Sequence, residues 1–285
     1  MTIPKNVIVI IGCGGMGVAI ARRIGSGSHI ILADYSSTQL ENAMTLLRPE
    51  GLSVEGVETN VSDFQSVQKL ARYASEMGHI SIIAHTAGVS PAQAPLDQIY
   101  KVDLLGTTHV IDAFLEVASA GTSLVAIASM AGHQSKQGIS PEFEKHLATS
   151  PAETLLSYPE LEASISNLDS AHQTSMMRGM AYGVSKWGNI LRVQASASAW
   201  AKKGARINSV SPGVISTAMG QQELEGDYAQ VIKSLIQNSP AGRIGTASDV
   251  ANAVAFLSGP EASFITGNDL LVDGGCISAQ TWDGN

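Results

Sequence analysis

The sequence has 285 residues, of which 44% are hydrophobic and 15% charged, and its formal net charge is −8 at pH 7. This length suits one large or two small domains, and the negative charge argues against a nucleic-acid or anionic-membrane surface. The apolar run at residues 7–11 is far too short to span a bilayer. Cys13 and Cys276 predict neither a disulfide framework nor a metal site. Because the start of the chain lacks a signal-peptide pattern, we expect a cytoplasmic protein.

The first elements predict a dinucleotide site. A Val- and Ile-rich run at residues 6–11 predicts a strand buried on both faces, followed by a glycine turn, a helix over 18–24 and a second strand over 29–33. Glycines let the backbone approach a pyrophosphate, and the N-terminus of the helix favours its negative charge. The alternative is an ordinary glycine-rich turn between a strand and a helix. The residues of this turn that we expect to bind the cofactor are Gly12, Gly14, Gly15, Met16 and Gly17.

Asp34 ends the second predicted strand and indicates which cofactor is bound. Its carboxylate can accept hydrogen bonds from both hydroxyls of the adenosine ribose, and it would repel a 2′-phosphate. No arginine follows at Tyr35 to neutralise such a phosphate. NAD is therefore favoured over NADP. The alternative role for Asp34 is the N-cap of the helix starting near Thr38.

Strands and helices alternate over the rest of the chain. Such repeats imply right-handed crossovers and a doubly wound parallel sheet, an α/β Rossmann fold that binds its ligands beyond the carboxyl ends of the strands. No linker, charge block or repeat divides the chain, so we predict one domain over residues 1–285. The predicted strands are 53–59, 80–84, 123–128, 206–210 and 269–272, and the predicted helices are 40–47, 66–77, 96–118, 227–237, 247–257 and the segment around residue 182.

Tyr182 and Lys186 are the candidate proton-transfer pair. Residues four apart on a helix project side by side, and an ammonium favours the phenolate over the phenol, whose ordinary pKa is about 10. The pair could therefore act as a general acid/base. On its own, this spacing more often marks an exposed helix pair.

Taken in order, the motifs of this chain resemble the short-chain dehydrogenase/reductase family over nearly its full length. The resemblance implies an NAD(H)-dependent oxidoreductase that interconverts a secondary alcohol and a ketone. It implies that Ser129 hydrogen-bonds the substrate oxygen, that Tyr182 exchanges its proton, and that Lys186 activates the tyrosine and binds the nicotinamide ribose. The motifs are Gly12 to Gly17, His85-Thr86-Ala87-Gly88, Ser129, Tyr182-Gly183-Val184-Ser185-Lys186, Pro212-Gly213-Val214-Ile215-Ser216-Thr217, and the tail 264–275. The further cofactor contacts implied are Asn60, Val61, Thr86, Ala87, Gly88, Pro212, Gly213, Ile215 and Thr217.

Four features depart from the family pattern. The glycine loop is one residue short, and His85-Thr86 stands where Asn-Asn is usual. Asp103 stands at the asparagine of the family's proton relay; it could serve that relay or be satisfied within its helix. The largest departure is an insert of roughly residues 133–176, which resembles that of the carbonyl reductase and 3α-hydroxysteroid dehydrogenase branches.

The insert carries two Pro-Glu helix starts, at Pro141 and Pro159, and predicts two or three short helices. We expect it to cover the substrate cleft and to crowd the face of the Tyr182 helix. That would leave the last strand and the helix at 247–257 as the surface for a homodimer, with a monomer as the alternative. A cleft with methionines suits a bulky apolar substrate. The substrate pocket is expected to be walled by residues near Ser90, Met130, His133, Met176, Met177 and Met219.

Two other functions fit parts of the pattern. An epimerase or dehydratase could use the same fold and Tyr–Lys pair, but such relatives usually have a larger C-terminal domain, whereas only about ten residues follow Gly275 here. A non-catalytic nucleotide sensor tends to lose the tyrosine or the lysine, and this chain keeps both. Oxidation or reduction of a small molecule therefore remains the favoured function.

Overall fold

The computed structural model describes residues 6–92, 94–166, 174–225 and 229–282. Its centre is a sheet of seven parallel strands in the order β3-β2-β1-β4-β5-β6-β9. The order reverses between β1 and β4, which creates the crevice where doubly wound sheets bind ligands. The predicted α/β Rossmann fold is confirmed. The strands are β1 (Asn6–Ile11), β2 (His29–Asp34), β3 (Ser53–Glu58), β4 (His79–His85), β5 (Ser123–Ile127), β6 (Arg206–Pro212) and β9 (Asp269–Val272).

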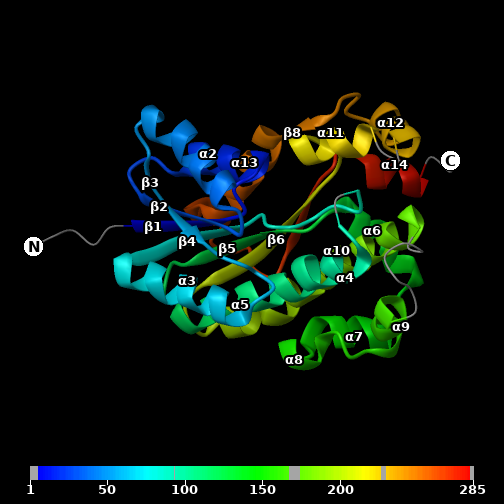
Figure 1. Ribbon diagram of the computed structural model, residues 1–285, viewed down its shortest axis with the longest axis horizontal. Coiled ribbons are helices and arrows are strands. Elements are labelled where there is room, and N and C mark those ends of the chain that lie inside the picture. Colours follow the sequence, from blue (N-terminus) through cyan, green and yellow to red (C-terminus); the bar gives the residue numbers. More distant parts are fainter. Residues whose placement is uncertain (1–5, 93, 167–173, 226–228, 283–285) are drawn as a thin grey trace, which may run out of the picture.

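Helices cover both faces of the sheet (Figure 1). Successive side chains of a strand point to opposite faces, so the apolar residues of β1 pack alternately into the hydrophobic cores on the two faces of the sheet. Val7 and Val9 pack with α3 (Phe64–Met77), α5 (Gly106–Val117) and α10 (Ser175–Ala201). Residues Ile8 and Ile10 pack on the other face. The helices of that face are α1 (Gly15–Ile24), α2 (Ser37–Leu47) and α13 (Ala247–Ser258).

The predicted long helix over 96–118 contains a segment of a different kind. It begins as α4 (Leu96–Ile99), continues as a π-helical segment (Tyr100–Leu105), labelled η2, and becomes α5, which ends at Val117. The wider turn closes where the Gly106 N–H donates to the carbonyl of Lys101. π-Helical turns often occur at functional sites, and this one carries Asp103.

The insert folds into short helices against the lower helical layer. Pro141 and Pro159 start helices as predicted, and Trp187 of α10 donates its indole hydrogen to Glu144 at 2.9 Å. The apolar side of the insert joins a cluster with α4, the π-helical segment and α10. The insert therefore crowds the α10 face, as expected. Its helices are α6 (Met130–Ser135), η3 (Lys136–Gly138), α7 (Pro141–Thr149), α8 (Ala152–Leu155) and α9 (Pro159–Ser166); residues 167–173 of the predicted insert lie outside the described part.

The remaining elements lie near the carboxyl edge of the sheet or at its last strand (Figure 1). The predicted helix over 227–237 is observed from Ala229; its first two positions lie outside the described residues. Among the described helices, none is both long and apolar enough for a bilayer crossing. These elements are β7 (Ile215–Ser216), α11 (Ala218–Glu225), α12 (Ala229–Gln237), β8 (Gly245–Thr246), η4 (Pro260–Ala262) and α14 (Cys276–Trp282); η1 (Arg48–Glu50) follows α2.

Leu147 tests whether the insert is part of the hydrophobic core. Its side chain is fully buried, so Leu147→Ala should lower the free energy of unfolding by about 2–5 kcal/mol, the usual cost of such a cavity. Leu46→Ala is the matched control, because Leu46 is a helical leucine that is 51% exposed, and it should change stability by about 0.5 kcal/mol or less. Urea titration measures both. Equal stability of the two variants would contradict the packing of the insert.

Candidate active site

A cavity of about 310 Å³ lies beyond the carboxyl ends of the central strands. A larger depression, about 520 Å³, lies at the amino ends of β2 and β3, and the described residues that line it include none of the predicted site residues. The 310 Å³ cavity is therefore the candidate site. The predicted site residues that line it are Met16, Thr86, Gly88, Asp103, Ser129, Tyr182, Lys186, Pro212, Gly213, Ile215 and Thr217.

The glycine turn has space for backbone only. Gly12 has a φ of +97°, and a Cβ there would lie 2.5 Å from the backbone nitrogen of Ala87. A Cβ on Gly17 would lie 2.0 Å from the Gly12 carbonyl oxygen. Helix α1 starts at Gly15, earlier than predicted, and its N-cap Gly14 makes no side-chain cap bond. The turn thus presents an uncapped helix N-terminus, which suits a pyrophosphate.

Asp34 lies beside this turn at the end of β2. Its Oδ2 accepts from the Cys13 N–H at 2.8 Å, and its Oδ1 accepts from the Ser36 N–H at 3.0 Å. A carboxylate oxygen can accept more than one bond, so both oxygens can still meet ribose hydroxyls. Ser36, not Asp34, is the N-cap of α2. Burial, and then the charge of Asp34, raise the pKa of the Cys13 thiol to about 12, so Cys13 is an inert small residue of the turn.

The segment after β3 lies next to Asp34 through a bond from the Thr59 N–H to the Asp34 carbonyl, 2.8 Å. The Asn60 side chain is held in a turn, because its Oδ1 accepts from the N–H and the hydroxyl of Ser62. His109 Nδ1 lies 2.9 Å from the Val61 carbonyl, so this nitrogen carries the hydrogen. Asn60 and Val61 therefore border the place expected for adenine without lining the 310 Å³ cavity.

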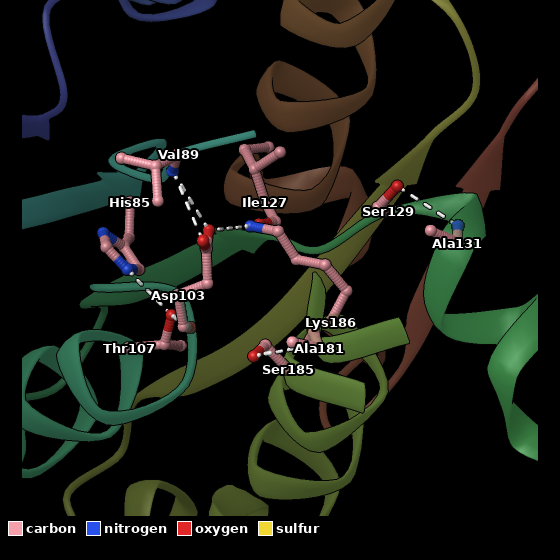
Figure 2. A network of polar contacts seen from close by, with 10 residues as sticks. All are labelled: His85, Val89, Asp103, Thr107, Ile127, Ser129, Ala131, Ala181, Ser185 and Lys186. Carbon is pink, nitrogen blue, oxygen red and sulfur yellow. Dashed lines mark hydrogen bonds and ion pairs between the residues drawn. The ribbon is translucent and has the colours of Figure 1, made fainter. Parts of the chain in front are cut away.

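A buried ion pair lies at the wall of the cavity, within the network of polar contacts that Figure 2 shows. Lys186 Nζ is 3.0 Å from Asp103 Oδ1 and 3.3 Å from the Ile127 carbonyl oxygen, and the two charged side chains are 5% and 0% exposed. The Val89 N–H donates to Asp103 at 3.3 Å. A Cβ on Gly88 would lie 2.5 Å from Asp103 Oδ1, so only glycine leaves room for this carboxylate.

The pair also sets the charge next to Tyr182, whose ring centroid lies 5.4 Å from Lys186 Nζ. Burial alone would lower the pKa of Lys186, but the Asp103 carboxylate and Tyr182 more than offset this, so the pKa is raised. Burial raises the pKa of Asp103, although Lys186 and the Val89 N–H favour its charged form. Lys186 is therefore a cation over the whole physiological range.

Ser129 and His85 have different surroundings. Ser129 is the N-cap of α6, where its oxygen accepts from the Ala131 N–H at 3.2 Å, and it lines the cavity. His85 is 1% exposed and lies behind the π-helical turn, 3.1 Å from Thr107. Burial, followed by the charge of Lys186, lowers the pKa of His85 to about 3, so it stays neutral. Its side chain is not among the described residues that line the cavity.

The predicted surroundings of the cavity are confirmed in part. Met130 and Met219 line the cavity themselves, and Val89, Pro91 and Gln134 line it beside Ser90 and His133. Met176 is 70% exposed and Met177 packs with the insert, so neither lines it. Of the insert's described residues, Gln134 of α6 lines the cavity, whereas α7–α9 pack below α10 (Figure 1). Because residues 167–173 of the insert lie outside the described part, the expectation that it covers the cleft stays a prediction. The lining residues that are neither predicted positions nor their direct neighbours are Ala92, Ile127, Gly179, Val231, Ile232 and Leu235.

Comparison with known proteins identifies the family. A sequence model described as short chain dehydrogenase matches residues 5–141, and one described as Enoyl-(Acyl carrier protein) reductase matches residues 147–276. The short-chain dehydrogenase/reductase bsc3 of Alternaria brassicicola is 38% identical over 275 residues, which cover 96% of each chain. The chain belongs to the short-chain dehydrogenase/reductase family. It is thus an enzyme of the oxidoreductase class that binds a nicotinamide cofactor.

More distant relatives agree with the fold and with the branch suggested by the insert. The 3-alpha-hydroxysteroid dehydrogenase/carbonyl reductase of Comamonas testosteroni is 26% identical over 273 residues, covering 95% of this chain and 96% of its own. The 3-alpha-hydroxysteroid dehydrogenase of Pseudomonas sp. B-0831, solved with NADH, superposes with a TM-score of 0.75 at 24% identity over 98% of this chain and all of its own. ElxO, solved with NADP, superposes with a TM-score of 0.70 at 22% identity over 97% of this chain and 100% of its own. Both cofactors thus occur among structures of this fold.

Two substitutions at Asp103 separate its charge from its hydrogen bonds. In Asp103→Asn the amide oxygen can still accept from Lys186 and Val89, so we expect turnover to fall less than about tenfold. Loss of the carboxylate removes the main cause that raises the pKa of Lys186, so Lys186 loses its proton at lower pH. The high-pH limb of the pH–rate profile should therefore move to lower pH.

Asp103→Leu removes both the charge and the acceptors and leaves Lys186 buried without its partner. Turnover should fall at least about 100-fold, the range of a lost acid/base contribution. Steady-state rates across pH decide both cases. Full activity of the Leu variant, or an unshifted profile of the Asn variant, would exclude the role assigned to the pair.

Proposed function

We propose that this enzyme uses NAD(H) to interconvert a neutral secondary alcohol and the corresponding ketone. The observation that carries the proposal is the Lys186–Asp103 pair beside Tyr182, with Ser129 on the same cavity wall. This arrangement provides a hydrogen-bond donor for a substrate oxygen and a proton carrier next to a fixed cation. A nucleotide sensor would need neither.

The residues present fit a nicotinamide dinucleotide. The glycine turn leaves the N-terminus of α1 open, and a Cβ on Gly15 would lie 3.3 Å from Thr217, so these two cofactor-binding segments meet. Asp34 would hold the adenosine ribose and disfavour a 2′-phosphate, which supports NAD over NADP. Gly12 to Gly17 would hold the pyrophosphate, while Thr86, Ala87, Gly88, Lys186 and residues Pro212 to Thr217 would surround the nicotinamide end. The bound cofactor supplies or accepts the hydride.

The side chains of this protein handle the proton. In the reducing direction, Ser129 would donate a hydrogen bond to the ketone oxygen, and Tyr182 would transfer its phenolic proton to that oxygen as it becomes a hydroxyl. The Lys186 ammonium stabilises the phenolate left behind. Asp103 keeps Lys186 charged and in place. In the oxidising direction the same groups take the proton from the alcohol.

The cavity favours an apolar, uncharged substrate. Its described lining residues include only two charged side chains, Asp103 and Lys186, and these pair with each other. The rest of the wall is largely aliphatic, with Met130, Met219 and the α12 residues Val231, Ile232 and Leu235. A phosphate or carboxylate on the substrate would find no partner there. A bulky neutral alcohol or ketone therefore fits best.

A screen of such alcohols and ketones, followed by NADH absorbance, tests the reaction. In Tyr182→Phe the ring remains and only the proton is lost, so NADH binding should be kept and turnover should fall at least about 100-fold. The matched control is Tyr73→Phe. Tyr73 lies in α3 and its phenol donates to Glu55 of β3, so removing this hydroxyl should leave turnover unchanged. A loss of less than about tenfold in Tyr182→Phe would show that another group donates the proton.

Cofactor choice is tested at Asp34. Asp34→Ala should weaken NADH binding, because the hydroxyls of the adenosine ribose lose their acceptor. It should also reduce discrimination against NADPH, because no negative charge then repels the 2′-phosphate. Glu116→Ala removes an exposed carboxylate on α5 and controls for net charge. Fluorescence titration with both cofactors gives the affinities. A wild-type preference for NADPH would refute the assignment.

We also propose a homodimer formed through β9 and α13, with a monomer as the alternative. The insert occupies the α10 face, whereas β9 is an edge strand and the rings of Phe264 and Phe256 nearby are 102% and 46% exposed. Light scattering should give twice the 29.7 kDa chain mass, and Phe264→Glu should give the single chain. A tetramer assembled through the α10 helices would contradict the proposal.

A further inference from the structure

A short helix, α6, forms part of the cavity wall. Helix α6 has six residues and begins directly after Ser129, its N-cap. Three of its residues, Met130, Ala131 and Gln134, line the cavity. A small rotation or slide of α6 would therefore move the Ser129 hydroxyl and the apolar wall together.

Glycines bring α6 into direct contact with the Tyr182 helix. A Cβ on Gly132 would lie 2.8 Å from the backbone nitrogen of Trp187, and one on Gly183 would lie 1.9 Å from Ser135 Oγ. These contacts set how near the two helices lie. They contain no directional bond, so they do not fix the rotation of α6 about its own axis.

His133 supplies a directional contact to the sheet. A second side-chain bond from α6, in which Gln134 Nε2 donates to Gln280 Oε1 at 3.1 Å, is exposed and reaches α14 instead of the sheet. His133 Nε2 lies 2.8 Å from Asp269 Oδ2, across to β9, and the His133 ring meets the ring of Trp187 edge-on at 5.9 Å. A carboxylate only accepts, so Nε2 carries the hydrogen. His133 lies one helical turn after Ser129, so a shift of the His133 ring would also shift the Ser129 hydroxyl.

Asp269 is itself held rigidly. Its side chain is 6% exposed, and Oδ1 accepts from Ser209 at 2.6 Å and from Ser211 at 3.0 Å, both on β6. A buried carboxylate with three donors has one orientation. The bond therefore ties α6 to the sheet itself and not to a mobile surface group.

We propose that His133 is a positioning residue for the reaction: its bond to Asp269 holds α6 so that the Ser129 hydroxyl points at the substrate oxygen. This inference rests on the proposed function, since it takes Ser129 as the group that binds this oxygen. His133 touches neither the cavity nor the reacting atoms.

Three variants separate the hydrogen bond from packing. His133→Gln keeps a donor at about the position of Nε2, His133→Leu keeps bulk without a donor, and His133→Asn has a donor too short to reach Asp269. His79→Leu is the control, because His79 bonds to Ser119 at the opposite end of the sheet.

The first measurement needs no substrate. Hydrogen–deuterium exchange should be at least about tenfold faster across residues 130–135 in His133→Leu than in the wild type. If the Leu variant does not fold, the same increase is expected in His133→Asn. His133→Gln and His79→Leu should match the wild type. Unchanged exchange in the Leu and Asn variants would overturn the proposal.

The second measurement uses 9,10-phenanthrenequinone, a neutral apolar diketone, and NADH. Since misplacement by about 1 Å can cost about 100-fold, kcat should fall about 10- to 100-fold in His133→Leu, with the NADH dissociation constant within twofold and near-normal kcat in His133→Gln. Equal loss in the Gln and Leu variants, or a normal kcat in His133→Leu, would overturn it. If the wild type reduces neither this probe nor any screened ketone, the proposed function fails. The exchange data still decide whether the His133–Asp269 bond holds α6 in place.

Discussion

The ion pair between Lys186 and Asp103 is the interaction on which the site depends. Two charges taken out of water are costly unless they are paired at good distance and their remaining hydrogen-bonding atoms are satisfied. Here the 3.0 Å contact is completed by the Ile127 carbonyl on the ammonium and the Val89 N–H on the carboxylate. The fold meets these requirements with four elements: the end of β4, the π-helical segment, β5 and α10.

The π-helical segment and the end of β4 have local features that serve the pair. The π-helical turn aims Asp103 inward, and Thr107 donates to its carbonyl at 2.7 Å, which satisfies an acceptor in the widened turn. Because the Thr107 hydrogen is used in this way, Thr107 accepts from His85. A protonated His85 would place a second cation near Lys186, so His85 must be neutral. The pKa of His85, lowered to about 3 by burial and by Lys186, is consistent with this. The two departures from the family pattern at 85 and 103 thus belong to one buried network.

The sequence predicted the features that are local in the chain. Buried strands, the glycine turn, Asp34 at the end of β2 and the Tyr–Lys spacing all follow from periodicity or from motifs of a few residues, and the structure places them as expected. It could not predict the π-helical turn, because a helical pattern tolerates one wider turn without a visible change. It also missed the wall formed by α12 and the bond from His133 to Asp269, whose partners lie 136 residues apart. Such contacts depend on the packing of whole elements.

The charge of Lys186 can be measured directly by following its Nζ through ¹⁵N-lysine NMR as pH rises, with Lys186→Arg to assign the signal. Exposed lysines lose their proton near pH 10.4. The account predicts that Lys186 titrates above this value in the wild type and at lower pH in Asp103→Asn. A Lys186 that is neutral at pH 7, or one that titrates identically in the two proteins, would contradict the claim that the buried pair keeps a cation beside Tyr182.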